Sequence, residues 1–486
     1  MRHGRSLLIA CSIIAGAVLI LRGSQAAPPA PSPTSAVDEL FTRWTEATPG
    51  CAVGVGVGGR PVLERAYGMS DLEHDVRNRP ETIFEAGSVS KQFTAAAVLL
   101  LVRDGKIGLD EPVRKYIPEL PDYGTPLTVR HMLNHTSGLR DWGSLAGIAG
   151  WPRGSRVHTH DHVVDILARQ KALNFPPGSR YSYSNSGYNL SAVLVSRVSG
   201  MSFAEFSRQR LFEPLGMSRT SWRDDYTRIL KDRAIAYAAT GTGFRQDMPF
   251  ENVHGNGGLL TTVGDLLRWN ENFVTPKVGD AAFVALQQTT TTFTSGAQQR
   301  YAFGLMIGTY KGLREVSHSG STAGYRAFLT RFPDQHVSVA VLCNAGPANA
   351  TALAHGVADL YLGDRVNASA AATPPPAETR GPLAGLARDD SFRPTATDLA
   401  AYAGTYESDE IETILFVEVR DAGLVIRRRP AAAIALRPHS RDRFEGGAGL
   451  GLVTFRRENG RVVALSVTQD RVWDLRFNRV DTDRGR

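Results

Sequence analysis

The spacing of apolar residues predicts two β-hairpins far apart in the chain. Apolar runs at 51–57 and 61–67 are joined by Gly58-Gly59-Arg60, a turn typical of a hairpin. Runs at 326–332 and 337–343 are separated by a Pro-Asp turn and follow the same pattern. Helical patterns lie between the two pairs, so we predict an antiparallel sheet closed by strands from both ends of this region and flanked by helices.

One of these helices is predicted over 90–103. The segment is dense in helix formers and apolar positions, and it ends at Asp104-Gly105, a helix stop signal. Gly54 to Gly59 superficially matches a dinucleotide-binding loop. No helix follows it, so the hairpin interpretation is preferred.

Beyond about residue 395 the pattern changes to short, closely spaced strand-like runs without a helix signal. Polar and glycine turns separate many of them, which predicts a small all-β meander barrel. This part holds no cluster of nucleophile, base or metal ligands, so we interpret it as a structural or assembly domain. The runs lie at 402–406, 414–419, 424–428, 434–437, 452–457, 462–467 and 472–477.

The first residues have the pattern of an export signal. Arg2 and Arg5 precede an apolar stretch at 7–21, and small residues near 26 suit a cleavage site. The stretch is shorter than the roughly 20 residues of a membrane-spanning helix. Arg22 directly after it nevertheless favours an uncleaved anchor. We expect an exported, periplasmic or extracellular protein, either released or anchored to the membrane by this segment.

Composition breaks divide the chain into five parts. Residues 1–26 form the predicted signal or anchor, and 27–36 form a Pro/Ala/Ser-rich leader expected to be disordered. The mixed helix and strand domain covers 37–365. A Pro/Ala-rich interdomain linker covers 366–394, and the barrel covers 395–486.

Composition also removes several classes of protein. Hydrophobic residues make up 42% and charged residues 21% of the chain, which excludes a mostly disordered, collagen-like or polytopic membrane protein. The formal net charge is +7, but three of these positive charges belong to the N-terminal segment. No long Lys/Arg run follows, so nucleic acid is not an expected partner.

Two cysteines, Cys51 and Cys343, remain after the N-terminal segment, and both fall in strand-like runs. An exported protein can pair them. Two buried free thiols in a core sheet explain the pattern equally well. Neither cysteine has the histidine neighbours expected of a cysteine nucleophile.

Ser88 and Lys91 introduce the predicted helix and are the first candidate chemical pair. A serine at a helix start lies near unpaired backbone N–H groups, and a residue three positions later lies on the same face. A lysine buried beside that hydroxyl can help to remove its proton. Ser-x-x-Lys alone is a weak signal, because a capping serine followed by a solvated lysine looks the same.

Two further places can complete such a site. Tyr183-Ser184-Asn185 follows a Pro-Pro-Gly loop just before the next helix signal. A tyrosine acts as a base only if a neighbouring cation lowers its pKa from about 10. His318-Ser319-Gly320-Ser321 enters a predicted strand, where the glycine permits close approach of a ligand backbone.

Together these three motifs resemble those of the penicillin-recognising serine hydrolases, namely class C β-lactamases, DD-peptidases and related esterases. The Tyr-x-Asn form of the second motif resembles the class C-like branch. The resemblance extends in order and spacing over about 37–364 and implies an α+β fold of the β-lactamase/transpeptidase type. The last hundred residues resemble the lipocalin-like barrel that often follows such domains. Further matching stretches lie at 130–139, 213–217 and 257–262.

The resemblance assigns a role to each matching residue. Ser88 would be the nucleophile, Lys91 its proton partner and Tyr183 a second contributor to the base. Asn185, His318, Ser319 and Gly320 would bind the substrate. The backbone N–H groups of Ser88 and Ser321 would form an oxyanion hole.

His318 departs from the lysine that many members have at this position. An imidazole with an ordinary pKa would hold a substrate carboxylate more strongly as pH falls towards 6. No cofactor or metal is expected.

Two histidine groups were considered as metal sites and rejected. His158-Thr159-His160-Asp161-His162 is one residue short of the metallo-β-lactamase signature, and Thr159 suits an N-cap for a helix over 161–170. His131 and His135 have helical spacing, but no Glu follows His131 as in a metalloprotease helix, so we interpret the pair as packing residues.

Two functions remain. The first is an exported serine hydrolase that forms an acyl-enzyme on a β-lactam, a D-amino-acid peptide or a small ester. The second is a non-hydrolytic penicillin-binding or sensor protein that uses the same pocket. The expected partner is a small-molecule or peptide substrate, with oligomer formation through the barrel as a further expectation.

Overall fold

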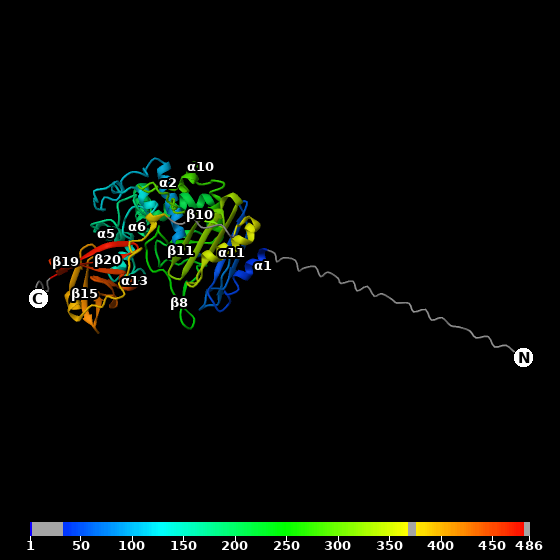
Figure 1. The fold of residues 1–486 in the computed structure, drawn as a ribbon. Coiled ribbons are helices and arrows are strands. Elements are labelled where there is room, and N and C mark those ends of the chain that lie inside the picture. Colours follow the sequence, from blue (N-terminus) through cyan, green and yellow to red (C-terminus); the bar gives the residue numbers. More distant parts are fainter. Residues whose placement is uncertain (2–32, 368–375, 481–486) are drawn as a thin grey trace.

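A six-stranded antiparallel sheet forms the frame of the first domain (Figure 1). The computed structural model describes residues 1, 33–367 and 376–480. The strand order β10-β11-β12-β13-β1-β2 places the first hairpin beside the last, which confirms the predicted closure of the sheet by both ends of the domain. The strands are β1 (Cys51–Val57), β2 (Arg60–Tyr67), β10 (Met306–Tyr310), β11 (Leu313–Thr322), β12 (Tyr325–Phe332) and β13 (Val337–Cys343).

Two adjacent strands of this sheet, β1 and β13, are joined by a disulfide. Cys51 in β1 and Cys343 in β13 are register partners, and their sulfur atoms are bonded. Of the two alternatives that the sequence left open, the structure has the paired cysteines.

Helices α1 (Pro33–Leu40) and α11 (Ala350–Leu362) cover one face of the sheet. Val37 and Phe41 are fully buried in the cluster between these helices and the strands. The predicted disordered leader therefore ends too late, because α1 includes its last four residues. Pro33 is the first helical residue, a position where proline's missing N–H is not needed.

A group of helices lies on the other side of the sheet. Its central helix is α2 (Lys91–Arg103), of which residues 91–101 are buried, and it packs against α6 (Asn185–Ser199). The other helices are α3 (Val129–Leu133), α4 (Trp142–Ile148), α5 (His160–Ala168), α7 (Phe203–Ser207), α8 (Glu213–Leu215), α9 (Val263–Glu271) and α10 (Ala281–Gln287).

Short elements connect these parts. The single-turn helices are η1 (Gly87–Ser90), η2 (Val113–Lys115), η3 (Arg208–Phe212), η4 (Pro333–Gln335), η5 (Gly363–Arg365) and η6 (Ala377–Thr379). The short strands are β3 (Met69–Asp71), β4 (Val76–Arg77), β5 (Phe84–Glu85), β6 (Ser221–Trp222), β7 (Tyr237–Ala239), β8 (Phe244–Gln246) and β9 (Leu259–Thr261).

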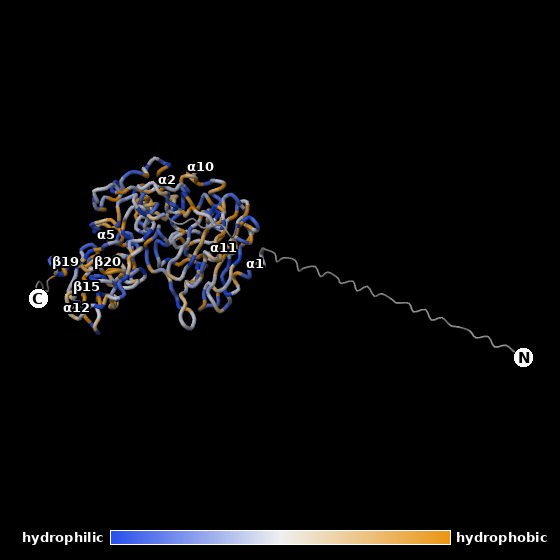
Figure 2. The backbone as a smooth tube through the Cα atoms, in the orientation of Figure 1, coloured by the Kyte–Doolittle hydropathy of each residue, from blue (hydrophilic) through white to orange (hydrophobic). Residues whose placement is uncertain are grey.

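The second domain is a closed barrel of eight antiparallel strands, as predicted. Each strand pairs with the next, and β14 pairs with β21 to close it. Hydrophobic residues recur along the strands of both domains (Figure 2). The strands are β14 (Gly404–Ser408), β15 (Thr413–Arg420), β16 (Gly423–Arg427), β17 (Ile434–Ser440), β18 (Arg443–Glu445), β19 (Leu452–Glu458), β20 (Arg461–Gln469) and β21 (Val472–Val480).

The barrel differs from the prediction in two details. Helix α12 (Ala396–Tyr402) precedes it and α13 (Gly447–Leu450) interrupts it, although no helix was expected. Thr395 caps α12 through a reciprocal bond with Asp398, a local signal that the sequence did carry. Strand β18 was missed because three residues are too few for an alternating pattern to show.

None of the helices among the described residues is long and apolar enough to cross a membrane. The predicted signal segment lies outside the described residues, apart from Met1.

Candidate active site

The sequence places Ser88 in a tight turn at the start of the central helix. Ser88 belongs to η1, directly before α2, and its side chain is partly exposed. Ser90 holds this turn, since its Oγ donates to Gly87 O at 2.5 Å and accepts from Leu259 N at 3.1 Å. The first N–H groups of such a turn have no partner within the helix, so they are free to point at a bound oxygen atom.

Lys91 lies beneath the Ser88 hydroxyl and is completely buried. Its Nζ is 3.2 Å from Ser88 Oγ. It also donates to Asn185 Oδ1 at 3.0 Å and to Asn256 O at 2.7 Å. The structure therefore brings Ser88, Lys91 and Asn185 together, as the sequence motifs predicted.

The surroundings of Lys91 favour its neutral form. Burial, and then the positive charges of Arg471 and Arg153, lower the pKa of Lys91 well below its ordinary value of 10.5, while Asp141 opposes this shift. A neutral amine can accept the proton of a neighbouring hydroxyl, which an ammonium cannot.

Tyr183 completes the group, with its ring 4.7 Å from Lys91 Nζ. Burial raises the pKa of Tyr183 above 10, and a hydrogen bond with Ser88 only partly opposes this. The sequence-based expectation that a nearby lysine makes Tyr183 a base is therefore not met. With these two opposite shifts, Lys91 is the better proton acceptor and the Tyr183 hydroxyl is a proton donor.

Two residues behind the motifs hold them in place. His135, which is buried, packs its ring 4.3 Å from that of Tyr183, and its Nδ1 accepts from Ser184 N. Asp141 accepts from Asn185 N at 2.8 Å through Oδ2 and caps α4 through Oδ1. The motifs alone did not identify either residue as part of the site.

Strand β11 passes directly beside the serine turn. A Cβ on Gly320 would lie 2.0 Å from Ala86 O, and one on Gly87 would lie 2.6 Å from Ser321 N. Only glycine fits at these two contacts. The sequence indicated close approach of a ligand backbone at Gly320, and the structure shows the protein's own serine turn there instead. Ser319 and Ser321 have exposed side chains along this edge of the cleft.

His318 differs from the expectation drawn from its sequence. It is buried, its Nε2 lies 2.8 Å from Tyr301 Oη, and its Nδ1 lies 2.6 Å from Ser319 O. Burial and the nearby Lys91 lower the pKa of His318 to about 3. The ring is therefore neutral near pH 7, and the expected gain of charge between pH 8 and 6 is wrong for this environment.

A cavity of about 430 Å³ opens beside Ser321. Its charged lining residues include Arg153 and Glu251, which are joined by an ion pair, and Asp247. Substrate groups next to the bond that reacts can extend into this space.

A turn of the barrel reaches the same site. Arg471, between β20 and β21, has its guanidinium carbon 4.9 Å from the centre of the Tyr183 ring. Nothing in the sequence indicated this residue, because the spacing of a barrel turn does not show which distant residues it contacts.

The histidines of the two groups make other contacts in the structure. His160 Nε2 lies 2.9 Å from His254 O, whereas His162 caps the start of α5 together with Thr159, as predicted for Thr159. His135 lies beyond the end of α3 and packs among aromatic rings, which confirms its interpretation as a packing residue.

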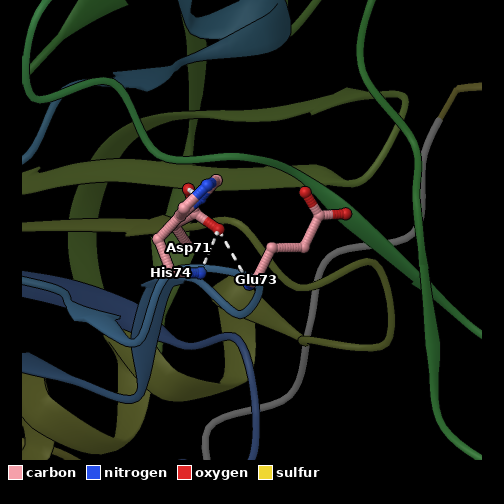
Figure 3. A group of neighbouring side chains, drawn as sticks. All are labelled: Asp71, Glu73 and His74. Carbon is pink, nitrogen blue, oxygen red and sulfur yellow. Dashed lines mark hydrogen bonds and ion pairs between the residues drawn. The ribbon is translucent and has the colours of Figure 1, made fainter.

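One group of potential ligands occurs among the described residues, at Asp71, Glu73 and His74 (Figure 3). Glu73 and His74 are exposed, and Asp71 is partly buried. Asp71 already accepts from the backbone N–H groups of Glu73 and His74 and contacts His74 Nδ1 at 2.7 Å, so these contacts account for the cluster without a metal.

Known proteins resemble this chain in sequence and in fold. The family model described as "Beta-lactamase" matches residues 37–364, more than half of the chain. Penicillin-binding protein 4* of Bacillus subtilis is 28% identical over 311 residues, which cover 59% of this chain and 66% of that protein. D-aminopeptidase of Brucella canis is 30% identical over 303 residues, which cover 61% of this chain and 56% of that protein. The chain thus spans less than two thirds of the length of each relative.

A solved structure resembles both domains together. The octameric penicillin-binding protein homologue from Pyrococcus abyssi is 25% identical, with a TM-score of 0.60 over 92% of this chain and 98% of that one. The match over 37–364, the serine motif at the start of α2 and the sheet that surrounds it lead to one conclusion: the chain belongs to the beta-lactamase family.

Proposed function

We propose that this protein is an exported serine hydrolase that forms an acyl-enzyme on an amide or ester bond, with Ser88 as the nucleophile. The observation that carries the proposal is the buried Lys91 amine, 3.2 Å from Ser88 Oγ, with its remaining contacts made to Asn185 Oδ1 and Asn256 O. This arrangement activates a hydroxyl and has no comparable purpose in a purely structural core.

The proposed reaction uses these groups in order. Lys91 accepts the Ser88 proton while Oγ attacks the carbonyl carbon, and the N–H groups of Ser88 and Ser321 stabilise the oxyanion. The Tyr183 hydroxyl then gives a proton to the leaving group as the bond between the carbonyl carbon and the leaving group breaks. The proton held by Lys91 then passes to Tyr183 and restores its hydroxyl. A water molecule then attacks the carbonyl carbon of the acyl-enzyme and releases the carboxylic acid product from Ser88.

The relatives and the site together support a proposed order of substrate classes. Two relatives are named as a D-aminopeptidase and a penicillin-binding protein. We therefore place D-amino-acid peptides and amides first, and β-lactams and small esters after them. The Tyr-x-Asn motif supports a place in the class C-like branch.

Covalent labelling together with turnover tests the function. Wild-type protein should be labelled by a fluorophosphonate and by penicillin, with the added mass on Ser88, and should turn over at least one of the three substrate types. Ser88→Ala should abolish both labelling and turnover while leaving the melting temperature nearly unchanged, because the side chain is partly exposed. Labelling that persists in this variant would contradict the nucleophile assignment.

The alternative, a non-hydrolytic penicillin-binding or sensor protein, is kept because one relative carries that name. It predicts stable acylation of Ser88 without release of product. Intact-mass measurements over time separate the two, since a hydrolase returns to its unmodified mass.

Assembly is a separate proposal. The similar protein from Pyrococcus abyssi is described as octameric, which supports oligomer formation through the barrel here. Light scattering of the intact chain, compared with a chain that ends before residue 366, measures whether the barrel contributes.

A further inference from the structure

The turn that carries Arg471 is fixed to the first domain by hydrogen bonds. Arg471 O accepts from Asp141 N and from Asn174 Nδ2, both at 3.1 Å. On either side of it, Trp473 N donates to Asn174 Oδ1 at 2.8 Å, and Ser182 Oγ donates to Asp470 O at 3.4 Å. The backbone at Arg471 is therefore held at the site independently of its side chain.

The guanidinium of Arg471 has no hydrogen bond or ion pair in the part of the chain that the structure describes. It is only partly exposed, and its contact is with the face of the Tyr183 ring. Arg153 and Arg140, by contrast, each have a carboxylate partner, because Arg153 forms an ion pair with Glu251 and Arg140 forms one with Glu410. A partly buried cation without an anion is costly unless a ligand supplies the opposite charge.

The position of this cation indicates which end of a substrate it faces. Tyr183 is the proposed donor to the leaving group, and Arg471 lies against its ring. His318, where many relatives have a charged lysine, holds its two ring nitrogens against Tyr301 and Ser319 and offers no charge. A carboxylate suits the remaining position, since guanidinium and carboxylate can form two parallel hydrogen bonds.

We propose that Arg471 binds the carboxylate of the substrate's leaving group, so that the barrel supplies the anion-binding residue of the active site. The preferred substrates are then peptides with a free C-terminal carboxylate. This proposal rests on the serine hydrolase function proposed above, but its test does not require turnover.

Binding to the inactive protein tests the proposal. In Ser88→Ala protein, calorimetry compares acetyl-D-alanyl-D-alanine with the same peptide ending in a carboxamide. The free acid should bind about tenfold more tightly than the amide, as expected for one charge-assisted contact. In the Ser88→Ala/Arg471→Met double variant the two affinities should become equal within about twofold. Arg471→Lys should retain part of the preference, because it keeps the charge and loses the paired geometry.

A matched control uses an arginine of β21, the strand that follows Arg471. Arg476 in β21 is exposed and bonds to Asn478 Oδ1, so Arg476→Met should leave the preference for the free acid unchanged. Equal binding of acid and amide in Ser88→Ala protein, no binding of the acid at millimolar concentration, or a preference that survives Arg471→Met would overturn the proposal. Failure of wild-type protein to label at Ser88 would instead overturn the proposed function, and Arg471-dependent binding would still be measurable.

Discussion

At the scale of single residues, the surroundings of Lys91 match the hydrogen-bonding capacity of a neutral amine. An amine has two N–H groups and one lone pair. Asn185 Oδ1 and Asn256 O accept two N–H groups of Lys91, and Ser88 Oγ is its third polar neighbour at 3.2 Å. In the neutral amine this third position is the lone pair, which can accept the proton of the Ser88 hydroxyl. An ammonium would use the serine oxygen as a third acceptor and could not remove its proton.

The pH dependence of activity should report this amine. Only unprotonated Lys91 is active, so kcat/KM for a neutral ester should fall as pH drops through the lowered pKa of Lys91. Arg471→Met removes a positive charge that lowers the pKa of Lys91, so protonated Lys91 should persist to higher pH. The acid limb of the pH–rate profile should therefore shift to higher pH. pH–rate profiles measure the shift, with Arg476→Met as the control. A limb that does not move would show that Arg471 has no influence on the base.

His318 leads to a prediction of the opposite kind. Because its pKa is lowered to about 3, the imidazole stays neutral from pH 8 to pH 6. The ratio of kcat/KM for an anionic substrate to that for a neutral ester of similar reactivity should therefore stay flat over this range, since the base is common to both. A ratio that rises on acidification would mean that His318 does gain a proton and anchors the anion after all.

At the scale of elements, the serine turn and β11 lie so close together that no side chain fits between them at Gly320. This contact positions the two backbone N–H groups proposed to bind the oxyanion. It depends on glycine, because a Cβ at position 320 would overlap Ala86 O, which is backbone and cannot rotate away. The strand would have to move away from the turn, and with it Ser321.

Gly320→Ala should consequently lower kcat by about 10²–10³, the effect of losing one oxyanion donor. Gly308→Ala is the matched control, since Gly308 lies in the neighbouring strand β10 and has no atom within 4 Å of a built Cβ. Steady-state kinetics and thermal unfolding measure both variants. Equal losses in the two variants, or a loss that only follows unfolding, would contradict a specific role of this contact.

Elements with local signals were predictable, whereas contacts between distant elements were not. The two hairpins, the helix after Ser88 and the Thr159 cap depend on neighbouring residues, so their patterns show in the sequence. The three motifs indicated the site because they resemble a family. The sequence did not reveal the pKa of His318 or the place of Arg471, because both depend on packing against residues far away in the chain.

At the scale of the whole molecule, the barrel reaches the candidate active site through Arg471, and a buried ion pair joins the two domains. Arg140 and Glu410 lie on different domains and are 2.6 Å apart, with only 3% and 8% of their side chains exposed. Glu410 Oε2 also accepts from Lys171 N at 2.7 Å, and Arg140 donates to Trp473 O at 3.2 Å. The pair thus connects the domain interface to the strand that follows Arg471.

Glu410→Gln should therefore destabilise the docked barrel by about 3–5 kcal/mol, because it leaves the buried Arg140 charge uncompensated. Asp409→Asn is a matched control in the neighbouring position. Its ion pair with Lys171 is 3.0 Å long, but the side chains are 66% and 77% exposed, so its loss should cost less than about 1 kcal/mol. Urea unfolding followed by tryptophan fluorescence measures the stability, and protease cleavage within 376–394 reports undocking.

Glu410→Gln should also weaken binding of the free-acid peptide in the Ser88→Ala background, since Arg471 reaches the site only when the barrel is docked. Equal destabilisation by both variants, or full carboxylate preference in a protein whose linker has become accessible to protease, would show that the ion pair does not hold the barrel at the active site.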